Sequence, residues 1–155
     1  MSQNNNLKRS LIPQSASKVN TNPKFIDKNA ALMKGWQSDG DKANVLISIK
    51  FIQHDFQCFS GWQKDEMNLF WDFSRRIHES TWSNIYSQSG KLEKTGFGIT
   101  NISRGQYPKS EFINSLSPDI GIVELRVSKK MRVHGFRFGA IFYLCFLDRN
   151  HEICP

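Results

Sequence analysis

The chain has 155 residues, of which 39% are hydrophobic and 23% charged, enough for one globular domain with a core and too few for two of ordinary size. Its formal net charge of +7 favours an acidic partner, and nucleic acid is the commonest acidic surface in a cell. Three cysteines without a CxxC pair do not indicate a disulfide framework and fit a reducing compartment. The longest apolar run, residues 138–147, is shorter than the roughly 20 residues that a membrane-spanning helix needs. We therefore expect a cytoplasmic protein that does not enter a membrane.

Residues 1–44 are rich in Asn, Ser and Lys, and their apolar residues follow no period. Such a segment buries too little apolar surface to offset the entropy of the chain. It predicts a disordered basic N-terminal arm, followed by a folded domain over residues 45–155. A short helix around residues 29–34 and a role of the arm in following RNA both stay open.

The folded part begins with a strand and a helix. Alternating apolar and polar residues over 45–53 predict a half-buried strand. A helical period follows over 60–80, where Ser60 and Gln63 match a capping box at its start. The residues expected on the buried side of this helix are aromatic or aliphatic: Trp62, Leu69, Phe70, Phe73 and Ile77.

A second, shorter helix is predicted over residues 80–88, with Trp82 and Ile85 as packing residues. The next segment, 89–119, is long, basic and rich in glycine, which predicts a flexible loop able to close over a bound partner. Its "KTGFG" lacks the spacing of a phosphate-binding P-loop.

Three closely spaced strands are predicted near the end, over residues 121–127, 131–137 and 140–147, with a fourth short one around 151–154. Short connections between them favour antiparallel pairing. The predicted fold class is therefore α+β: an N-terminal strand, two helices and an antiparallel meander, with the helices packed on one face of the sheet.

Side chains along these strands alternate between the two faces of the sheet. The apolar set, which we expect to meet the helices, is Val123, Leu125, Val127 and Val133. The polar set, which we expect to gather on the other face, is Glu124, Arg126, Arg132 and His134. Tyr143 on the next strand is able to join the polar set, depending on register.

This polar set is suited to cleaving a phosphodiester. Arginine binds phosphate and stabilises the charge of the transition state, and histidine or glutamate moves a proton near neutral pH. In RNA the 2′-hydroxyl supplies the nucleophile, so neither a metal nor a cofactor is required. The competing interpretation is an ordinary solvated face that carries cross-strand ion pairs.

A metal site is the other chemical interpretation. His54 lies four residues before Cys58, and His151 lies three residues before Cys154. Zinc accepts such ligands, but neither pair belongs to a recognised four-ligand spacing. We therefore expect no metal.

The closing stretch "ELRVSKKMRVHGFRFGAIFYLCFLDRNHEI" resembles the C-terminal half of the RelE/ParE superfamily, the toxins of type II toxin–antitoxin systems. The order of strand, two helices and meander over residues 45–155 is also similar to that superfamily. The resemblance implies a small basic ribonuclease that cleaves messenger RNA on the ribosome and is neutralised by a small antitoxin protein.

By position, the resemblance implies a catalytic set of four residues: Arg126, Arg132, His151 and Glu124. The expected nucleic-acid-binding residues are Lys129, Lys130, His134 and Arg137, on or near the same strands, and Lys94 in the loop over 89–119. The chain departs from the family in its N-terminal arm and its loop over 89–119. A non-catalytic basic module that binds nucleic acid or a protein partner remains the alternative function, and an accessory protein with a solvated polar face is the third.

Overall fold

The computed structural model describes residues 40–88 and 96–155. Most of the expected N-terminal arm, the helix considered near residues 29–34 and the candidate binding residue Lys94 lie outside the described residues. Within the described part, no helix is long and apolar enough to cross a membrane.

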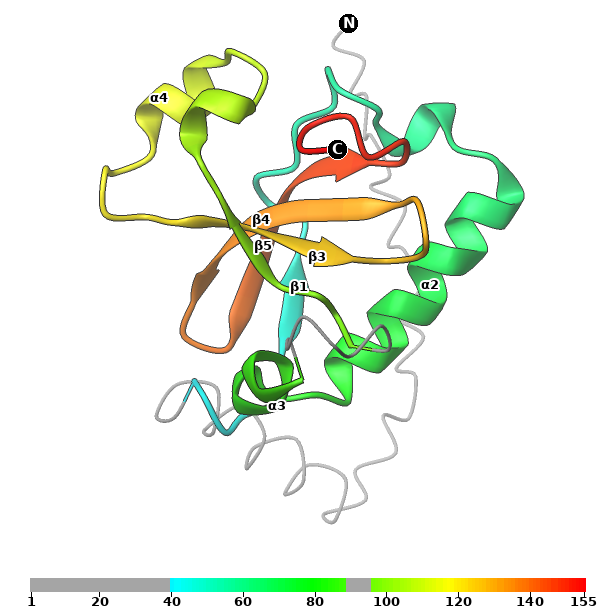
Figure 1. The fold of residues 1–155 in the computed structure, drawn as a ribbon, viewed down its shortest axis with the longest axis vertical. Helices are drawn as coiled ribbons and strands as arrows, with labels where there is room; N and C mark the ends of the chain where they lie inside the picture. Colours follow the sequence, from blue (N-terminus) through cyan, green and yellow to red (C-terminus); the bar gives the residue numbers. More distant parts are fainter. Residues whose placement is uncertain (1–39, 89–95) are drawn as a thin grey trace, which may run out of the picture.

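The centre of the fold is a five-stranded mixed sheet with the order β1-β5-β4-β3-β2 (Figure 1). The long strands β3 (Ile122–Arg126), β4 (Arg132–Phe138) and β5 (Ile141–Asp148) form the predicted antiparallel meander. The short strand β1 (Leu46–Ser48) runs parallel to β5 at one edge, and β2 (Thr100–Ile102) runs antiparallel to β3 at the other.

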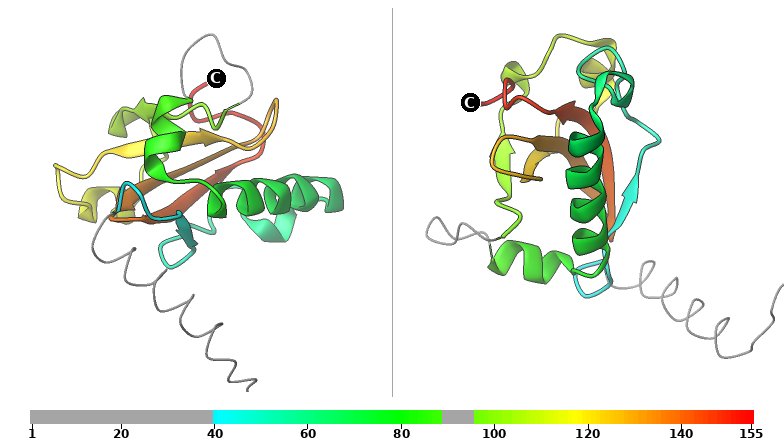
Figure 2. Two further views of the ribbon diagram at one scale, coloured as in Figure 1. Left: turned by 90° about the horizontal axis from the view of Figure 1, so that it is seen from below. Right: turned by 90° about the vertical axis from the view of Figure 1, so that its right-hand side faces the viewer.

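Helices α2 (Lys64–His78) and α3 (Trp82–Ser87) cover one face of the sheet, and Figure 2 shows α2 beside the strands from two further sides. Phe73 and Ile77 of α2 and Trp82 of α3 are fully buried against the apolar side chains of the meander. The sheet residues predicted for this core all belong to it: Val123, Leu125, Val127 and Val133. The predicted α+β fold class, with the two helices on one face, is confirmed.

The start of α2 differs from the prediction. Ser60 lies in a 3₁₀ turn, η1 (Phe59–Gly61), and the helix begins after Gln63. The backbone N–H of Gln63 donates to Glu66 Oε2 over 2.7 Å, so the capping box lies three residues later than the sequence indicated. Leu69 is 43% exposed rather than part of the core, because the helix turns it toward solvent.

Two predicted strands are shorter or missing. The first strand ends at Ser48, well before residue 53, and Ile49 is 59% exposed. Residues 151–154, considered as a last strand, form an irregular turn instead. The side chain of Asp148 accepts hydrogen bonds from two backbone N–H groups of this turn. These bonds satisfy donors that would otherwise need a partner strand.

The largest difference concerns the described part of the predicted loop. Residues 96–121 contain β2, the 3₁₀ turn η2 (Arg104–Gln106) and a short helix, α4 (Glu111–Ser115). Tyr107 and Ile113 from this segment pack with Ile122 and Phe146 as a second hydrophobic core on the face opposite α2. The sheet face that was expected to carry exposed charges is therefore covered, because this segment supplies apolar side chains that need burial.

A bulge and a glycine shape the contact between β4 and β5. The register shifts between His134 and Gly135, which leaves Cys145 as an extra residue in β5. A Cβ atom on Gly135 would lie 2.9 Å from the ring of Phe142 and closer still to the carbonyl oxygen of Tyr143. Only glycine lets these two strands approach this closely.

We predict that Gly135→Ala destabilises the protein by about 3 kcal/mol, because the added methyl group overpacks a buried strand contact. The matched control is Gly121→Ala, where an added Cβ meets nothing within 4 Å. Urea unfolding of both variants measures the difference. A loss for Gly135→Ala no larger than that for Gly121→Ala would contradict the packing described for this strand pair.

Candidate functional site

Four ionisable side chains from three adjacent strands meet inside the second core. Glu124 of β3, Arg132 and His134 of β4, and Asp148 of β5 are each at most 8% exposed. The register explains the meeting, because Glu124 lies opposite His134, and Arg132 lies opposite Asp148. Buried ionisable groups are costly unless they pair, so these four act as one electrostatic unit.

Glu124 is the centre of this unit. Its Oε1 lies 3.4 Å from Nε of Arg132, and its Oε2 lies 3.5 Å from Nε2 of His151 and 3.8 Å from Nε2 of His134. One carboxylate therefore faces three basic side chains. Of these, His151 is the most accessible, with 27% of its side chain exposed.

His134 is held by a hydrogen bond on its far side. Its Nδ1 lies 3.1 Å from the hydroxyl oxygen of Tyr107, while its Nε2 lies 3.5 Å from Oδ2 of Asp148 and faces Glu124 as well. With two carboxylates before it, Nε2 carries the ring proton, so in the neutral ring Nδ1 accepts from Tyr107. Burial and the nearby charge of Glu124 raise the pKa of Tyr107 well above its usual range, which keeps its hydroxyl protonated.

Asp148 ties the cluster to the end of the chain. Burial alone would raise the pKa of Asp148, but its interaction with His134 and the backbone N–H groups of Glu152 and Ile153 lower it below the usual value. These N–H groups donate over 2.8 and 2.9 Å and fix the turn that carries His151. His151 has a φ of 57°, in the left-handed region that histidine tolerates better than most residues.

Two atoms in the cluster are buried without a hydrogen bond among the described residues: Oε2 of Glu124 and Nε2 of His134. They face each other at a distance too long for a good hydrogen bond. Unsatisfied buried atoms are rare and costly, and they are more often found where a site does chemistry than in an ordinary core.

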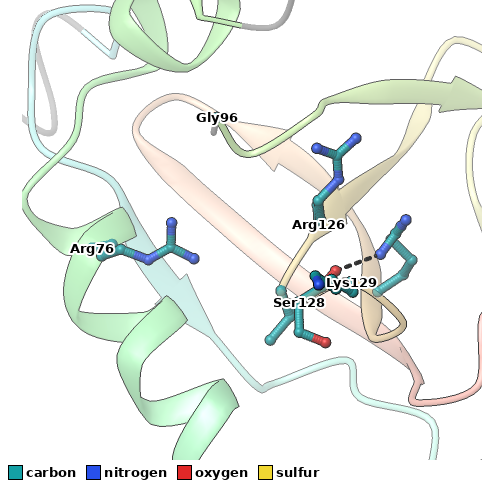
Figure 3. Close-up of a pocket in the computed structure, with 7 residues that line it drawn as sticks. Arg76, Gly96, Arg126, Ser128 and Lys129 are labelled. Carbon is teal, nitrogen blue, oxygen red and sulfur yellow. Dashed lines mark hydrogen bonds between the residues drawn. The ribbon is translucent and has the colours of Figure 1, made fainter. Parts of the chain in front are cut away.

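A basic pocket of about 500 Å³ opens beside the cluster (Figure 3). Arg132 belongs to both, since it lines the pocket and pairs with Glu124. Burial and the charge of Arg126 lower the pKa of Arg132, and the charges of Glu124 and Asp148 act against this. The basic side chains among the residues that line the pocket are Arg76, Arg126, Lys129 and Arg132.

The four catalytic candidates from the sequence thus lie around one place. Arg132 and Glu124 belong to the cluster, His151 contacts Glu124, and Arg126 lies opposite Arg132 and lines the pocket. Tyr143 does not join them, since its ring packs against Phe51 and Phe136 at the other end of the sheet.

The residues predicted to bind nucleic acid lie in different parts of the structure. Lys129 lines the pocket, and Lys130 is exposed in the same β3–β4 turn. His134 is 0% exposed, so it cannot touch a nucleic acid directly. Arg137 lies at the far end of β4, where it pairs with Asp41 and packs over the ring of Trp82.

Three residues of the site were missed by sequence reasoning. Asp148 lies at the end of an apolar strand, and it faces Arg132 of β4 because of the register shift between His134 and Gly135, which the sequence pattern does not reveal. Tyr107 lies in an irregular segment, and Arg76 is one of several charged residues on α2, so neither had a signal in the sequence.

Within residues 40–88 and 96–155, no group of three or more His, Cys, Asp or Glu side chains is arranged to hold a metal ion. His54 pairs with Asp55, and Cys58 contacts Ser60. Burial raises the pKa of Cys145 to about 12, so its thiol stays protonated at neutral pH.

No family model, curated protein or solved structure matches the chain. The geometry of the site therefore carries the functional argument.

We predict that Asp148→Asn destabilises the protein by about 3 kcal/mol at pH 6, because it removes a buried charge that pairs with His134. Since folding lowers the pKa of Asp148, its contribution is present above the unfolded value near pH ~4 and is lost as pH falls through the folded value. The difference between wild type and variant should therefore shrink from pH 6 to pH 3. Chemical denaturation at both pH values measures it.

The matched control is Asp72→Asn, at an exposed residue whose oxygen lies 3.9 Å from Arg75. It should change stability by less than about 0.5 kcal/mol at either pH. A difference for Asp148→Asn that stays constant between pH 6 and pH 3 would count against the charge as the source of its stabilisation.

We predict that Tyr107→Phe costs about 1–3 kcal/mol, because Nδ1 of His134 then loses its partner in a buried place. Tyr143→Phe, on the same face of the sheet, is the control for loss of a hydroxyl. Urea unfolding measures both variants, and the ¹⁵N shifts of the His134 ring report which nitrogen carries the proton. Equal losses for the two variants would show that the hydrogen bond contributes nothing.

Proposed function

We propose that the chain is a metal-independent endoribonuclease of the RelE type, which cleaves messenger RNA by general acid–base catalysis. One observation carries the proposal: Arg132 lines an open basic pocket and also pairs with Glu124, whose second oxygen lies 3.5 Å from His151. The basic pocket, which suits a phosphate, thus lies beside Glu124 and His151, which are able to transfer protons. The order of strand, two helices and antiparallel meander supports the same reading.

In the proposed reaction, His151 takes the proton of the ribose 2′-hydroxyl. With Nε2 directed at Glu124, its Nδ1 is the nitrogen that accepts this proton, and the carboxylate of Glu124 stabilises the imidazolium. The 2′-oxygen then attacks the adjacent phosphorus, and the bond from phosphorus to the 5′-oxygen breaks. His151 returns the proton to the 5′-oxygen, which yields a 2′,3′-cyclic phosphate and a 5′-hydroxyl.

The arginines stabilise the negative charge that develops on the phosphate. Arg132 is held by Glu124 and by the carbonyl oxygens of Ser128 and Met131, at 2.8 and 3.1 Å, so it needs little rearrangement. Arg126 stands opposite it across the β3–β4 pair. Donors fixed in advance in this way lower the barrier more than mobile ones. The partners of such an enzyme would be RNA, the ribosome and a small antitoxin protein.

A second candidate is a basic module that binds nucleic acid or a protein without cleaving it. The observation in its favour is burial: Glu124 and Arg132 are 7% and 8% exposed, as expected of groups that serve stability. This candidate predicts salt-dependent binding without turnover.

Cleavage of end-labelled RNA, free and on translating ribosomes, in the presence of EDTA separates the two candidates. We expect products that end in a 2′,3′-cyclic phosphate, and a fall of about 10²–10⁴-fold in rate for His151→Ala because the proton-transfer group is lost. Arg126→Ala should lower the rate as well, through lost charge stabilisation.

The control is His54→Ala, at an exposed histidine whose side chain contacts Asp55, and it should leave the rate unchanged. RNA binding without cleavage by wild type would favour the binding module. Undiminished cleavage by His151→Ala would remove that residue from the mechanism.

A further inference from the structure

The segment Gly96–Phe97–Gly98 is the "GFG" of a motif that did not fit a P-loop, and its first residue, Gly96, lines the basic pocket. It is packed tightly on both sides. A Cβ on Gly96 would lie 2.6 Å from the carbonyl oxygen of Gln88, at the end of α3. Gly98 has a φ of 56°, and a Cβ there would lie 3.1 Å from Nη2 of Arg126. Glycine at position 98 therefore lets the guanidinium of Arg126 lie against the backbone, and glycine at position 96 lets the segment pack against Gln88.

The same segment holds a second arginine. Phe97 is buried, and the guanidinium carbon of Arg76 lies 5.2 Å from the centre of its ring, a cation–π distance. The carbonyl oxygen of Phe97 accepts a hydrogen bond of 2.6 Å from the backbone N–H of Arg126. One residue thus fixes the positions of two arginines that come from α2 and β3.

A third cation is placed by the β3–β4 turn. Lys129 is exposed in this turn, and the carbonyl oxygen of its neighbour Ser128 accepts a hydrogen bond of 2.8 Å from Arg132 (Figure 3). Figure 3 shows Arg76 extending from α2 toward this turn, across the pocket.

Among the described residues that line the pocket, four have basic side chains and none is acidic. Glu124 pairs with Arg132 and offsets the charge of that residue. Gathering these cations costs free energy: besides burial, the charge of Arg126 lowers the pKa of Arg132. An anionic ligand with more than one charge would repay this cost. A volume of about 500 Å³ also exceeds what a single phosphate fills and lies in the range of ligand sites.

We propose that Arg76 and Lys129 form a subsite for a second phosphodiester of single-stranded RNA, next to the one held by Arg126 and Arg132. This inference rests on the proposed function and adds to it a minimum substrate with two consecutive phosphodiesters. Arg76 then binds substrate without touching the reacting atoms, and Phe97 positions it.

Binding of a fluorescein-labelled 2′-O-methyl RNA oligonucleotide tests the subsite apart from catalysis, since this probe keeps the phosphates and lacks the nucleophilic hydroxyl. Its affinity is measured as a function of salt for Arg76→Gln and Lys129→Gln. We expect about fivefold weaker binding for each, the loss of one exposed ion pair. The slope of log K against log salt should fall by about 0.7, the value of one phosphate contact on a single strand.

Arg75→Gln is the matched control for Arg76→Gln. Arg75 is the exposed neighbour on the same helix, lies 3.9 Å from Asp72, and is not among the residues lining the pocket. Lys64→Gln, at the exposed start of α2, serves in the same way for Lys129→Gln. Affinities and slopes of Arg76→Gln and Lys129→Gln that equal those of the controls would overturn the subsite, whether or not the protein cleaves RNA.

Cleavage of short substrates tests the second-phosphate subsite independently of binding. Arg76→Gln should lower kcat/KM about fivefold for a trinucleotide with two phosphodiesters and leave it unchanged for a dinucleotide with one, because one exposed contact is lost. An equal effect on both substrates would contradict the second-phosphate role. If the oligonucleotide binds as expected but wild type cleaves nothing, the subsite stands and the nuclease function fails.

Discussion

The carboxylate of Glu124 is the group on which the arrangement of this protein depends. It lies between Arg132, His134 and His151, and so joins β3 to β4 and to the C-terminal turn. Without it, Asp148 would be the one acidic group among the described residues that offsets the charge of the buried Arg132, and breaking a buried ion pair costs about 3–5 kcal/mol. Arg132 pairs with this carboxylate and also lines the pocket. Glu124 therefore contributes both to the stability of the fold and to the proposed chemistry.

The fold class follows from local sequence patterns, but these patterns do not predict what covers each face of the sheet. Alternation assigned Leu125 and Val133 to one face and Glu124 and His134 to the other, which agrees with the burial of the first pair under α2. Alternation says nothing of what lies above the polar face. Residues 96–121 cover it through contacts with strands far along the chain, and such contacts leave no period in the sequence.

The sequence predicts only the part of the candidate site that depends on local strand pairing. Arg126, Arg132 and Glu124 lie on two strands joined by a short turn, so their proximity follows from a hairpin. Arg76 reaches the pocket from α2 because Phe97 supports it, and that contact spans separate elements. On a helix surface an arginine looks like any solvated charge, so only the folded chain distinguishes Arg76 from its neighbour Arg75.

The bulge in β5 connects the fold to the site. With an unbroken register beyond Tyr143 and its partner Phe136, Leu147 would lie opposite Arg132, and Asp148 would point to the other face. The extra residue, Cys145, shifts the register by one, so that Asp148 faces Arg132 and Phe146 faces His134. Bulges often re-aim a side chain beside a site. Here the bulge directs a carboxylate into the cluster, and the glycine at Gly135 permits the close strand contact next to it.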